Sequence, residues 1–193
     1  MRMSKEAAAA SRVRIVEAAS RLLRERGIGA TSIADVMAAA GMTHGGFYKH
    51  FRSKEDLVAA ALEAAFATHA DRFAQRSETN GPQAALQAYV AEYLSAKHVT
   101  HSGLGCPAAA LGSDAGREAA GVTSAFSQGV EALIAHVAAG APAGTEAPEA
   151  RASAIRRLAM MVGAVVVARG VGEGPLRSEV LAACLNEART AVA

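Results

Sequence analysis

Tryptophan is absent from this sequence, and only 4% of its 193 residues are aromatic. β-Branched residues are also scarce, and no stretch alternates apolar and polar side chains as a half-buried strand requires. Alanine dominates the apolar half of the composition, which favours close packing between helices. These features predict an all-α protein of one large domain or two small ones.

Disulfide pairs, long apolar runs and a strong net charge are also missing. The two cysteines, Cys106 and Cys184, lie far apart without a CxxC pattern, which argues against a disulfide scaffold and a structural zinc site. The longest apolar run is about ten residues, whereas a bilayer needs about twenty, so we expect no membrane partner. Because the N-terminus lacks an apolar core with a cleavage site, we expect a cytoplasmic protein. The net charge of +2 does not by itself indicate nucleic-acid binding.

Catalytic and metal-binding patterns are equally hard to find. The sequence has no nucleophile elbow, no phosphate loop and no His–carboxylate pair at a useful spacing. His98 and His101 could bind a metal together with His69 or His136, but no carboxylate or cysteine lies at a confirming spacing. We therefore predict a protein that is not an enzyme and has neither a metal site nor a cofactor.

The N-terminal part predicts three short helical units. The first helix runs from about Lys5 to Arg26 and is stopped by Gly27. Its apolar face is expected to carry Val13, Val16, Ala19, Leu22 and Leu23. The basic residues elsewhere on it have two interpretations, a solvated face or phosphate contacts near its start from Arg2, Lys5 or Arg12. A second helix begins after Thr31 or Ser32, where Ser32 and Asp35 form an acidic capping box, and ends at Gly41.

A third, short helix is expected from His44 to His50, capped by Thr43. Phe47 and Phe51 are four residues apart and should anchor it to the preceding helices, while Tyr48 points outward. The other exposed residues are His44, Gly45 and Lys49, with Gly46 at the margin. Two short helices joined by a tight turn are typical of a helix-turn-helix, which presents its second helix to the DNA major groove.

Gly45 and Gly46 oppose helix formation, at a cost of about 0.5–1 kcal/mol each relative to alanine. They have two interpretations. Close approach to DNA would require the absence of a side chain, or the first helical turn simply tolerates glycine because its amides are unpaired.

The remaining sequence predicts further helices. Ser53 and Asp56 cap a long helix that ends near Ser77 and connects a helix-turn-helix domain, residues 1–53, to a second domain, residues 54–193. The segment from His98 to Pro107 is expected to be a loop. The other expected helices carry Leu86 to Leu94, or run over about Pro107–Gly112, Ala115–Ala139, Pro148–Arg169 and Leu176–Val192.

Residues 10–60 closely resemble the DNA-binding domain of the TetR family of bacterial transcriptional regulators. The resemblance rests on Thr31-Ser32, Ala40-Gly41-Met42-Thr43, Phe47-Tyr48, His50-Phe51 and the run from Ser53 to Leu57. The later two-thirds match only in length and helical layout. The family fold implies about nine helices, with the last two forming a four-helix bundle between two copies.

Carried onto this sequence, the resemblance implies specific DNA contacts. Tyr48 and Lys54 would contact phosphates, with Thr43 and Ser32 as auxiliaries. The positions that read base edges are His44, Gly45, Gly46 and Lys49. His50 would touch the DNA backbone or lock the helix. Ala34 stands where many members carry a base-contacting arginine, so specificity should depend more on the third helix and the basic N-terminal arm.

The last two helices offer faces for a homodimer. The first face carries Ala159, Met160, Gly163, Val166 and Val167, and the second carries Val180, Leu181, Cys184, Leu185 and Ala188. Both faces could instead be core within one chain. A symmetric dimer would read a palindromic double-stranded operator.

Two inputs could control such a regulator. The first is an apolar pocket for an unidentified small molecule, lined by Tyr89, Tyr93, Leu104, Leu111, Phe126, Val130, Met160 and Met161. The second is Cys106, which precedes a short helix whose dipole would favour the thiolate. Some TetR-like regulators of reactive electrophiles carry a glycine–cysteine pair in a comparable loop. The alternative is that Cys106 only fills the core.

The sequence as a whole therefore predicts a homodimeric, one-component repressor. It would be released from its operator by an effector or by modification of Cys106. The alternatives are an activator, a DNA-binding protein that responds to no ligand, and a helical small-molecule-binding module.

Overall fold

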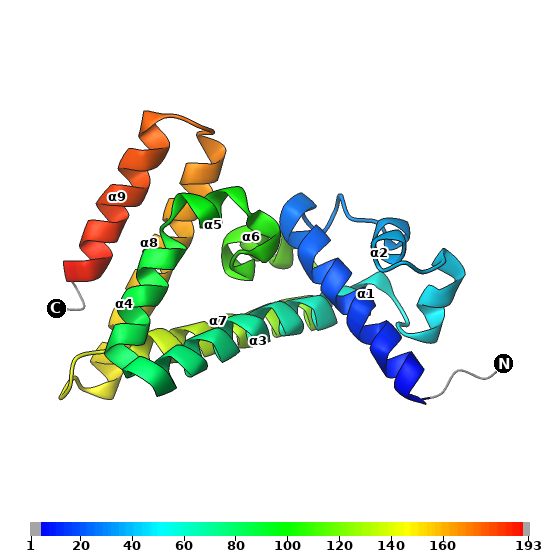
Figure 1. The fold of residues 1–193 in the computed structure, drawn as a ribbon, viewed down its shortest axis with the longest axis horizontal. Helices are drawn as coiled ribbons and strands as arrows, with labels where there is room; N and C mark the ends of the chain where they lie inside the picture. Colours follow the sequence, from blue (N-terminus) through cyan, green and yellow to red (C-terminus); the bar gives the residue numbers. More distant parts are fainter. Residues whose placement is uncertain (1–4, 191–193) are drawn as a thin grey trace.

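The computed structural model describes residues 5–190, and every regular element in that range is a helix, which confirms the all-α prediction. In Figure 1 one end of the molecule is formed by α1 (Lys5–Arg26), α2 (Ile33–Ala39) and the 3₁₀ helix η1 (His44–Lys49). Next come α3 (Lys54–Asn80), α4 (Pro82–Tyr93), α5 (Ala96–Thr100), the 3₁₀ helix η2 (Ser102–Leu104) and α6 (Pro107–Ala115). The remaining helices are α7 (Ala120–Ala139), α8 (Ala147–Gly170) and α9 (Pro175–Thr190).

The predicted bounds of α1 and the predicted caps of α2 and α3 are confirmed. α1 has the expected bounds, and Gly27 ends it with a φ of +85°, a conformation that glycine adopts without strain. Ser32 caps α2, and the Oγ of Ser53 caps α3 by accepting a hydrogen bond from the Asp56 amide at 3.2 Å. Two predicted features lie outside the described residues: the phosphate contact of Arg2 and the end of the last helix at Val192.

The segment expected to be a loop, from His98 to Pro107, is largely helical, so that expectation is wrong. α5 begins beyond Ser95, whose Oγ accepts a hydrogen bond from the His98 amide at 3.3 Å. η2 follows after His101. The Ser95 cap was the available sequence signal, but a five-residue helix has too little periodicity to recognise.

Two further expectations in the N-terminal part need correction. The third helix is a 3₁₀ helix, with hydrogen bonds from Gly46 to Thr43 and from His50 to Phe47. Thr43 occupies the cap position, but its side chain makes no capping hydrogen bond. Val13, expected on the apolar face of α1, is exposed, whereas Ile15 is fully buried.

The helix expected from Ala115 begins five residues later. α6 continues to Ala115, which is buried, and Gly116 caps it. α7 then starts at Ala120. The sequence did not show where one helix ended, because both flanks of Gly116 are rich in alanine and have similar helix propensity.

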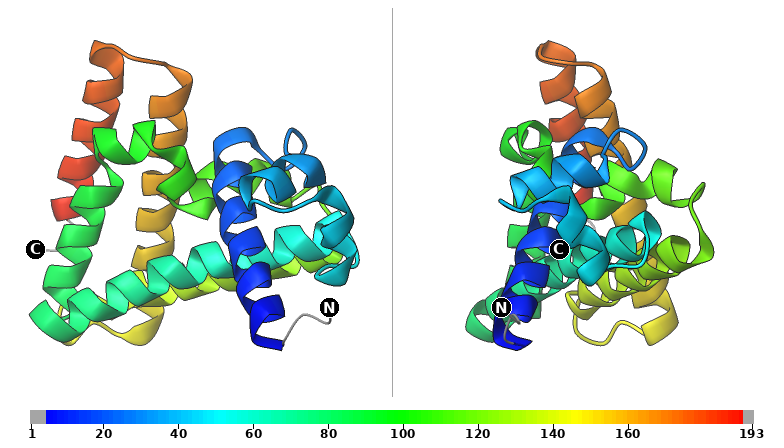
Figure 2. Two further views of the ribbon diagram at one scale, coloured as in Figure 1. Left: turned by 45° about the vertical axis from the view of Figure 1, so that its right-hand side comes forward. Right: turned by 90° about the vertical axis from the view of Figure 1, so that its right-hand side faces the viewer.

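α3 and α7 lie side by side along the length of the molecule, as Figure 1 and the left view of Figure 2 show. Their closest approach depends on Gly129 of α7, where an added Cβ would lie 2.1 Å from the ring of Phe66 on α3. Phe66 in turn contacts Phe126 edge to face, with ring centroids 5.7 Å apart. α3 thus connects the N-terminal helices rigidly to the rest of the molecule. The division at residues 53 and 54 stays a prediction, since α3 begins at that point and continues through both parts.

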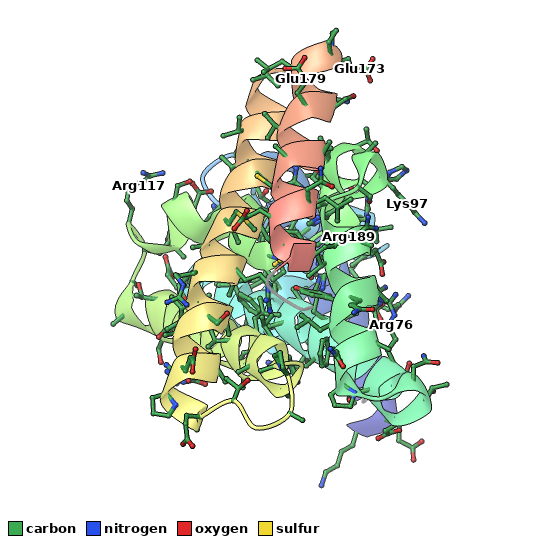
Figure 3. The ribbon with its side chains drawn as sticks, turned by 90° about the vertical axis from the view of Figure 1, so that its left-hand side faces the viewer. Arg76, Lys97, Arg117, Glu173, Glu179 and Arg189 are labelled. Carbon is green, nitrogen blue, oxygen red and sulfur yellow. The ribbon has the colours of Figure 1, made fainter. Side chains whose placement is uncertain are left out.

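α8 and α9 are neighbours joined by a short turn that contains Gly172 and Gly174, both with positive φ (Figure 3). Leu181 and Ala188 of α9 are buried within the chain. None of the helices within residues 5–190 is long and apolar enough to span a membrane.

Candidate DNA-binding surface and effector cavity

The start of α2 is fixed by a reciprocal pair of hydrogen bonds between Ser32 and Asp35. The Asp35 amide donates to Ser32 Oγ at 3.1 Å, and the Ser32 amide donates to Asp35 Oδ2 at 3.1 Å. The Ser32 hydroxyl also donates to Oδ2 at 2.6 Å. These hydrogen bonds from Ser32 lower the pKa of the Asp35 carboxyl. A phosphate contact from Ser32 would therefore have to redirect a hydroxyl that already has a partner.

η1 is held from one side by aromatic packing. Phe47 is fully buried, and its ring stacks on Phe51 with centroids 5.8 Å apart. Tyr48 is 68% exposed and touches Phe47 edge to face at 5.1 Å. The buried rings of Phe47 and Phe51 thus hold one side of the helix, while the exposed Tyr48 lies on the other.

The residues expected to read bases lie on the open side of η1. His44, Gly45 and Lys49 are exposed, as is Thr43 before them, while Gly46 and His50 are half-buried. An added Cβ at Gly45 would meet nothing within 4 Å, whereas one at Gly46 would lie 3.5 Å from Met37 Cε. Of the residues predicted to read bases, His44, Gly45 and Lys49 are therefore accessible, whereas Gly46 is half-buried.

Lys54 has a structural partner that the sequence did not indicate. Its Nζ donates a hydrogen bond of 2.7 Å to the carbonyl oxygen of Ile28, in the turn after α1. This bond ties the start of α3 to the end of α1. Because an ammonium group has three N–H donors, Lys54 can still direct a proton toward a phosphate.

Arg12 also takes part in this region. Its guanidinium carbon lies 4.8 Å from the centroid of the Phe51 ring, a cation–π distance. The pair forms one wall of a shallow groove that also includes His50 and Arg52. No sequence spacing connects Arg12 with Phe51, because Arg12 lies in α1 and Phe51 lies in the segment between η1 and α3.

A cavity of about 200 Å³ lies between α3, α4, α5 and η2. Its lining combines aromatic, imidazole and charged side chains: His69, Arg72, Phe73, Arg76, Tyr89, Glu92, Tyr93, Ser95, Lys97, His98, His101, Leu104 and Gly105.

The apolar wall of the cavity is a chain of edge-to-face rings. Phe73 contacts Tyr89 at 5.9 Å, Tyr89 contacts Tyr93 at 5.6 Å, and Tyr93 contacts His98 at 4.5 Å between centroids. Tyr89 is 9% exposed and Tyr93 is 3% exposed. Within the described residues, the Tyr89 hydroxyl and the buried Nε2 of His69 have no hydrogen-bond partner. The Tyr93 hydroxyl lies beside the Cys106 thiol.

The rim of the cavity is basic. Arg76 forms an ion pair with Glu92, the one acidic residue of the lining. Arg72 and Lys97 are exposed and form no ion pair within residues 5–190. Burial lowers the pKa of His69 to about 4, and the basic residues nearby act in the same direction. The cavity therefore carries two uncompensated positive charges at its rim.

The structure divides the residues expected to form an apolar effector pocket. Tyr89, Tyr93 and Leu104 line the cavity, with Leu104 exposed at its edge. Cys106, Leu111 and Met161 are buried in the core. The others, Phe126, Val130 and Met160, are half-buried side chains packed against that core. Sequence reasoning missed the basic and imidazole residues of the lining, because the short helix that supplies Lys97 and His98 was not recognised.

Cys106 differs from the reactive thiol that its place before α6 suggested. It is 0% exposed, and burial raises the pKa of its thiol. The nearby Tyr93 hydroxyl and the amides of Ala108 and Ala109 favour the thiolate, but burial is the larger effect. The expectation that the helix dipole makes Cys106 a thiolate is therefore wrong for this conformation.

His98 holds the segment around Cys106 in place. Its Nε2 accepts a hydrogen bond of 2.9 Å from the Cys106 amide, so its Nδ1 must carry the proton. Nδ1 accordingly donates to the Tyr93 carbonyl at 2.7 Å. The ring is thus neutral, in agreement with burial lowering the pKa of His98. Arg169 of α8 donates to the His98 carbonyl at 3.0 Å.

Two hydrogen bonds connect this segment to the N-terminal helices. Arg24 of α1 donates through Nη1 to the Gly105 carbonyl at 3.0 Å. At the other end of α6, Asp114 Oδ2 accepts from the Ile28 amide at 2.9 Å. A displacement of the cavity wall at Gly105 would therefore act directly on α1.

The expected dimer face on α8 is open in the single chain. Ala159, Gly163, Val166 and Val167 are exposed, the two valines by 49% and 48%, whereas Met160 is half-buried. On α9, Leu181 and Ala188 are buried within the chain, and Val180, Cys184 and Leu185 are half-buried against it. The α8 face is therefore available to a partner, while most of the α9 face is already used as core.

Metal ligands do not gather within residues 5–190. No group of three or more histidine, cysteine, aspartate or glutamate side chains there is arranged to hold an ion. His98, one of the histidines considered for this role, uses both ring nitrogens in hydrogen bonds.

The N-terminal sequence is similar to known regulators. Residues 15–61 match the family described as "Bacterial regulatory proteins, tetR family". The HTH-type transcriptional regulator TtgR of Pseudomonas putida is 42% identical over 79 residues, which cover 41% of this chain and 37% of TtgR. The HTH-type transcriptional repressor Rv3405c of Mycobacterium tuberculosis is 45% identical over 49 residues, or 25% of this chain and 26% of the relative. The chain thus matches 37% of the length of TtgR and 26% of the length of Rv3405c.

Solved structures share the fold over nearly the whole chain. The reduced form of NemR from E. coli has a TM-score of 0.79 at 21% identity, covering 95% of this chain and 97% of NemR. A TetR transcriptional regulator from Legionella pneumophila has a TM-score of 0.79 at 18% identity, covering 98% of each chain. The TM-scores show a common fold, and at such low sequence identity the similarity shows the fold alone.

Proposed function

We propose that this chain is a homodimeric transcriptional repressor of the TetR family of bacterial regulatory proteins. Residues 15–61 match that family, and TtgR is 42% identical over 79 residues. The observation that carries the proposal is the arrangement of η1. Phe47 and Phe51 anchor one side of it, and Tyr48 and Lys49 are exposed on the other. A short helix anchored in this way can enter a major groove as one rigid piece.

The DNA contacts are assigned by chemistry and exposure. Tyr48 and Lys54 bind phosphate oxygens, with Thr43 and Ser32 beside them. His44, Gly45, Gly46 and Lys49 approach the base edges, where the Lys49 ammonium suits guanine O6 or N7. His50 supports the helix from its inner edge. Arg12, held over Phe51, adds a cation beside this surface.

The dimer is proposed to form through α8 together with the outer side of α9. Val166 and Val167 are two exposed valines on adjacent positions of α8, and Gly163 lets a partner helix approach closely. A two-fold axis there would set the spacing of the two η1 helices, so the operator should be palindromic.

Release from DNA is proposed to start in the cavity between α3, α4, α5 and η2. An effector there would displace the wall at Gly105, and the Arg24 hydrogen bond would pass the displacement to α1. Shifts of α3 and α6 would then change the separation of the two η1 helices. Modification of the Cys106 thiol is the second proposed input; it requires the segment that covers Cys106 to open first, since the thiol is buried.

The experiment is a gel shift with the purified protein and the DNA upstream of its own gene, at moderate salt. A repressor gives a shift that a random duplex of the same length does not compete away, and Lys49→Ala weakens it. Absence of any specific shift would contradict the proposal and favour a small-molecule-binding module. A reporter gene under that DNA then separates repression from activation by the sign of the change.

The thiol input has its own test. The protein is exposed briefly to an electrophile, and the modified cysteine is identified by mass spectrometry. Reaction at Cys106, with loss of DNA binding that Cys106→Ser prevents, supports this input. Reaction at Cys184 alone would exclude it.

A further inference from the structure

The cavity between α3, α4, α5 and η2 is lined by charged as well as apolar side chains. Its charged residues are concentrated at the rim, while Phe73, Tyr89 and Tyr93 form the apolar wall. Figure 3 shows Arg76 and Lys97 on the same edge of the molecule, the first from α3 and the second from α5. A ligand in this cavity meets cations at one end and aromatic rings at the other.

The positive charge at the rim is not neutralised by the protein. Glu92 is paired with Arg76, which leaves Arg72 and Lys97 without an ion pair within the described chain. Bringing two cations together at a concave surface is unfavourable unless an anion accompanies them. An anionic group on a ligand would accept charge-assisted hydrogen bonds from Arg72 and Lys97.

The size of the cavity limits the rest of the ligand. Pockets for drug-sized molecules measure about 300–1,000 Å³. The cavity here is about 200 Å³, so it accommodates a body of roughly one ring. The edge-to-face chain of Phe73, Tyr89 and Tyr93 offers ring faces and edges that favour a planar, apolar body over a branched one.

A third feature concerns the inner end. The Tyr89 hydroxyl is buried and has no hydrogen-bond partner within the described residues, which costs free energy unless something satisfies it. The Tyr93 hydroxyl differs, because it lies beside the Cys106 thiol. The Tyr89 side chain is more than nine-tenths buried and lines the cavity. A hydroxyl on the far side of a ligand ring from its acidic group would give the Tyr89 hydroxyl a hydrogen-bond partner.

We propose that this cavity binds a small, planar organic anion, a single-ring carboxylate of the hydroxybenzoate type. The carboxylate lies between Arg72 and Lys97, and the ring packs on the aromatic wall. This inference rests on the proposed function, in which the same cavity is the effector site, and it specifies the chemical class of the effector.

The test uses isothermal titration of the full-length protein with 4-hydroxybenzoate and with its neutral analogue 4-hydroxybenzamide. We expect the carboxylate to bind at least tenfold more tightly than the amide. The double variant Arg72→Gln/Lys97→Gln should lose at least tenfold in affinity for the carboxylate and less than threefold for the amide. The control is Arg117→Gln, which removes an exposed arginine on the opposite edge of the molecule in Figure 3 and should leave both affinities unchanged.

Several results would overturn the proposal. They are an amide that binds as tightly as the carboxylate, a double variant that keeps its affinity, and no detectable binding of the carboxylate. Tyr89→Phe separates the role of the hydroxyl, since it should reduce the preference for 4-hydroxybenzoate over benzoate by at least threefold. A parallel gel shift without ligand tests the repressor proposal separately from the proposed ligand class. Operator binding without carboxylate binding rejects the ligand class alone, whereas carboxylate binding without operator binding rejects the repressor alone.

Discussion

Arg24 of α1 donates a 3.0 Å hydrogen bond to the carbonyl oxygen of Gly105, a residue that lines the cavity. Its Nε simultaneously donates to the Ser20 carbonyl at 3.0 Å, so the guanidinium is held within its own helix. Gly105 cannot carry a side chain here, because a Cβ would lie 2.7 Å from the ring of His98 and 3.1 Å from Arg169 Nη2. The helix that supports η1 and the wall of the cavity are thus joined at one backbone carbonyl.

Replacing Arg24 with methionine should reduce the free energy of unfolding by about 1–3 kcal/mol, because the carbonyl of the buried Gly105 would lose a charged donor. Amide hydrogen exchange should also become faster around Gly105. Chemical denaturation and exchange mass spectrometry measure the two effects.

Arg21→Met is the control, since it removes the same charge from an exposed position on the same helix. Among the described residues Arg21 forms an ion pair only with Glu25, at 3.5 Å, and such exposed pairs contribute about 0–1 kcal/mol. Equal destabilisation by the two variants would show that the Arg24 hydrogen bond has no special role.

The two exposed donors of η1 should respond differently to substitution. Lys49→Ala should cost about 1–3 kcal/mol of binding free energy on the preferred operator and relax the sequence preference at one base pair. Tyr48→Phe removes only a phosphate contact, so it should weaken binding to all duplexes by a similar factor. Binding to a panel of operators with single substitutions measures both.

A uniform loss caused by Lys49→Ala would instead make that side chain a phosphate contact. Tyr48→Phe should not alter the fold, because the edge-to-face contact with Phe47 involves the ring alone. A change in sequence preference with Tyr48→Phe would contradict its assignment.

The N-terminal helices could be predicted well because their signals are local. Gly27 and the Ser32–Asp35 box determine helix ends within a few residues, and Phe47 and Phe51 are anchors at helical spacing. The same kind of signal failed at η1, since the choice between α and 3₁₀ hydrogen bonds in six residues is not encoded in periodicity.

The cavity could not be predicted because its residues meet only in three dimensions. Arg72, Glu92 and Lys97 come from three helices and look like solvated surface in the sequence. Conversely, Met161 is of a residue type that often lines ligand pockets, but its side chain is fully buried in the core. Apolar content indicated where the core lies, while the uncompensated charges that distinguish the cavity depended on tertiary structure.

Lys54 is expected to have two roles that one variant can separate. Lys54→Met removes the hydrogen bond to Ile28 and should lower the free energy of unfolding by about 1–3 kcal/mol. If Lys54 also neutralises a phosphate, the slope of log K against log[salt] should fall by about 1 unit. Denaturation and salt-dependent DNA binding measure the two roles, and an unchanged salt slope would exclude the phosphate contact.

His69 should make stability depend on pH below neutrality. Its pKa is about 4 in the folded protein, because burial disfavours the charged ring, and about 6.5 in the unfolded chain. The unfolded state therefore binds the additional proton between these values, and stability is lost as the pH falls from 6.5 toward 4. The loss from this residue is at most about 3 kcal/mol.

The measurement for His69 is denaturation at several pH values between 4.5 and 8. His69→Asn should reduce the slope of stability against pH in the acidic range and leave it unchanged above pH 7. An identical acidic slope in both proteins would show that His69 is not the group responsible.

Gly45 allows the two explanations of its presence to be tested. It is exposed on η1, and an added Cβ would meet nothing within 4 Å. Since glycine costs about 0.5–1 kcal/mol relative to alanine in a helix, Gly45→Ala should stabilise the free protein by up to that amount. If the glycine exists to let η1 approach DNA closely, the same substitution should weaken operator binding at least tenfold.

Gly121→Ala is the matched control, because Gly121 is also exposed and helical with open space around it, but it lies on α7. It should stabilise the protein without changing DNA affinity. If Gly45→Ala behaves in the same way, its glycine is merely tolerated at the start of η1. A stabilised protein that no longer binds its operator would instead show that the chain accepts a weaker helix in exchange for a closer approach to DNA. The two variants differ in the surface on which the methyl group is placed, so DNA affinity is the measurement that decides between the explanations.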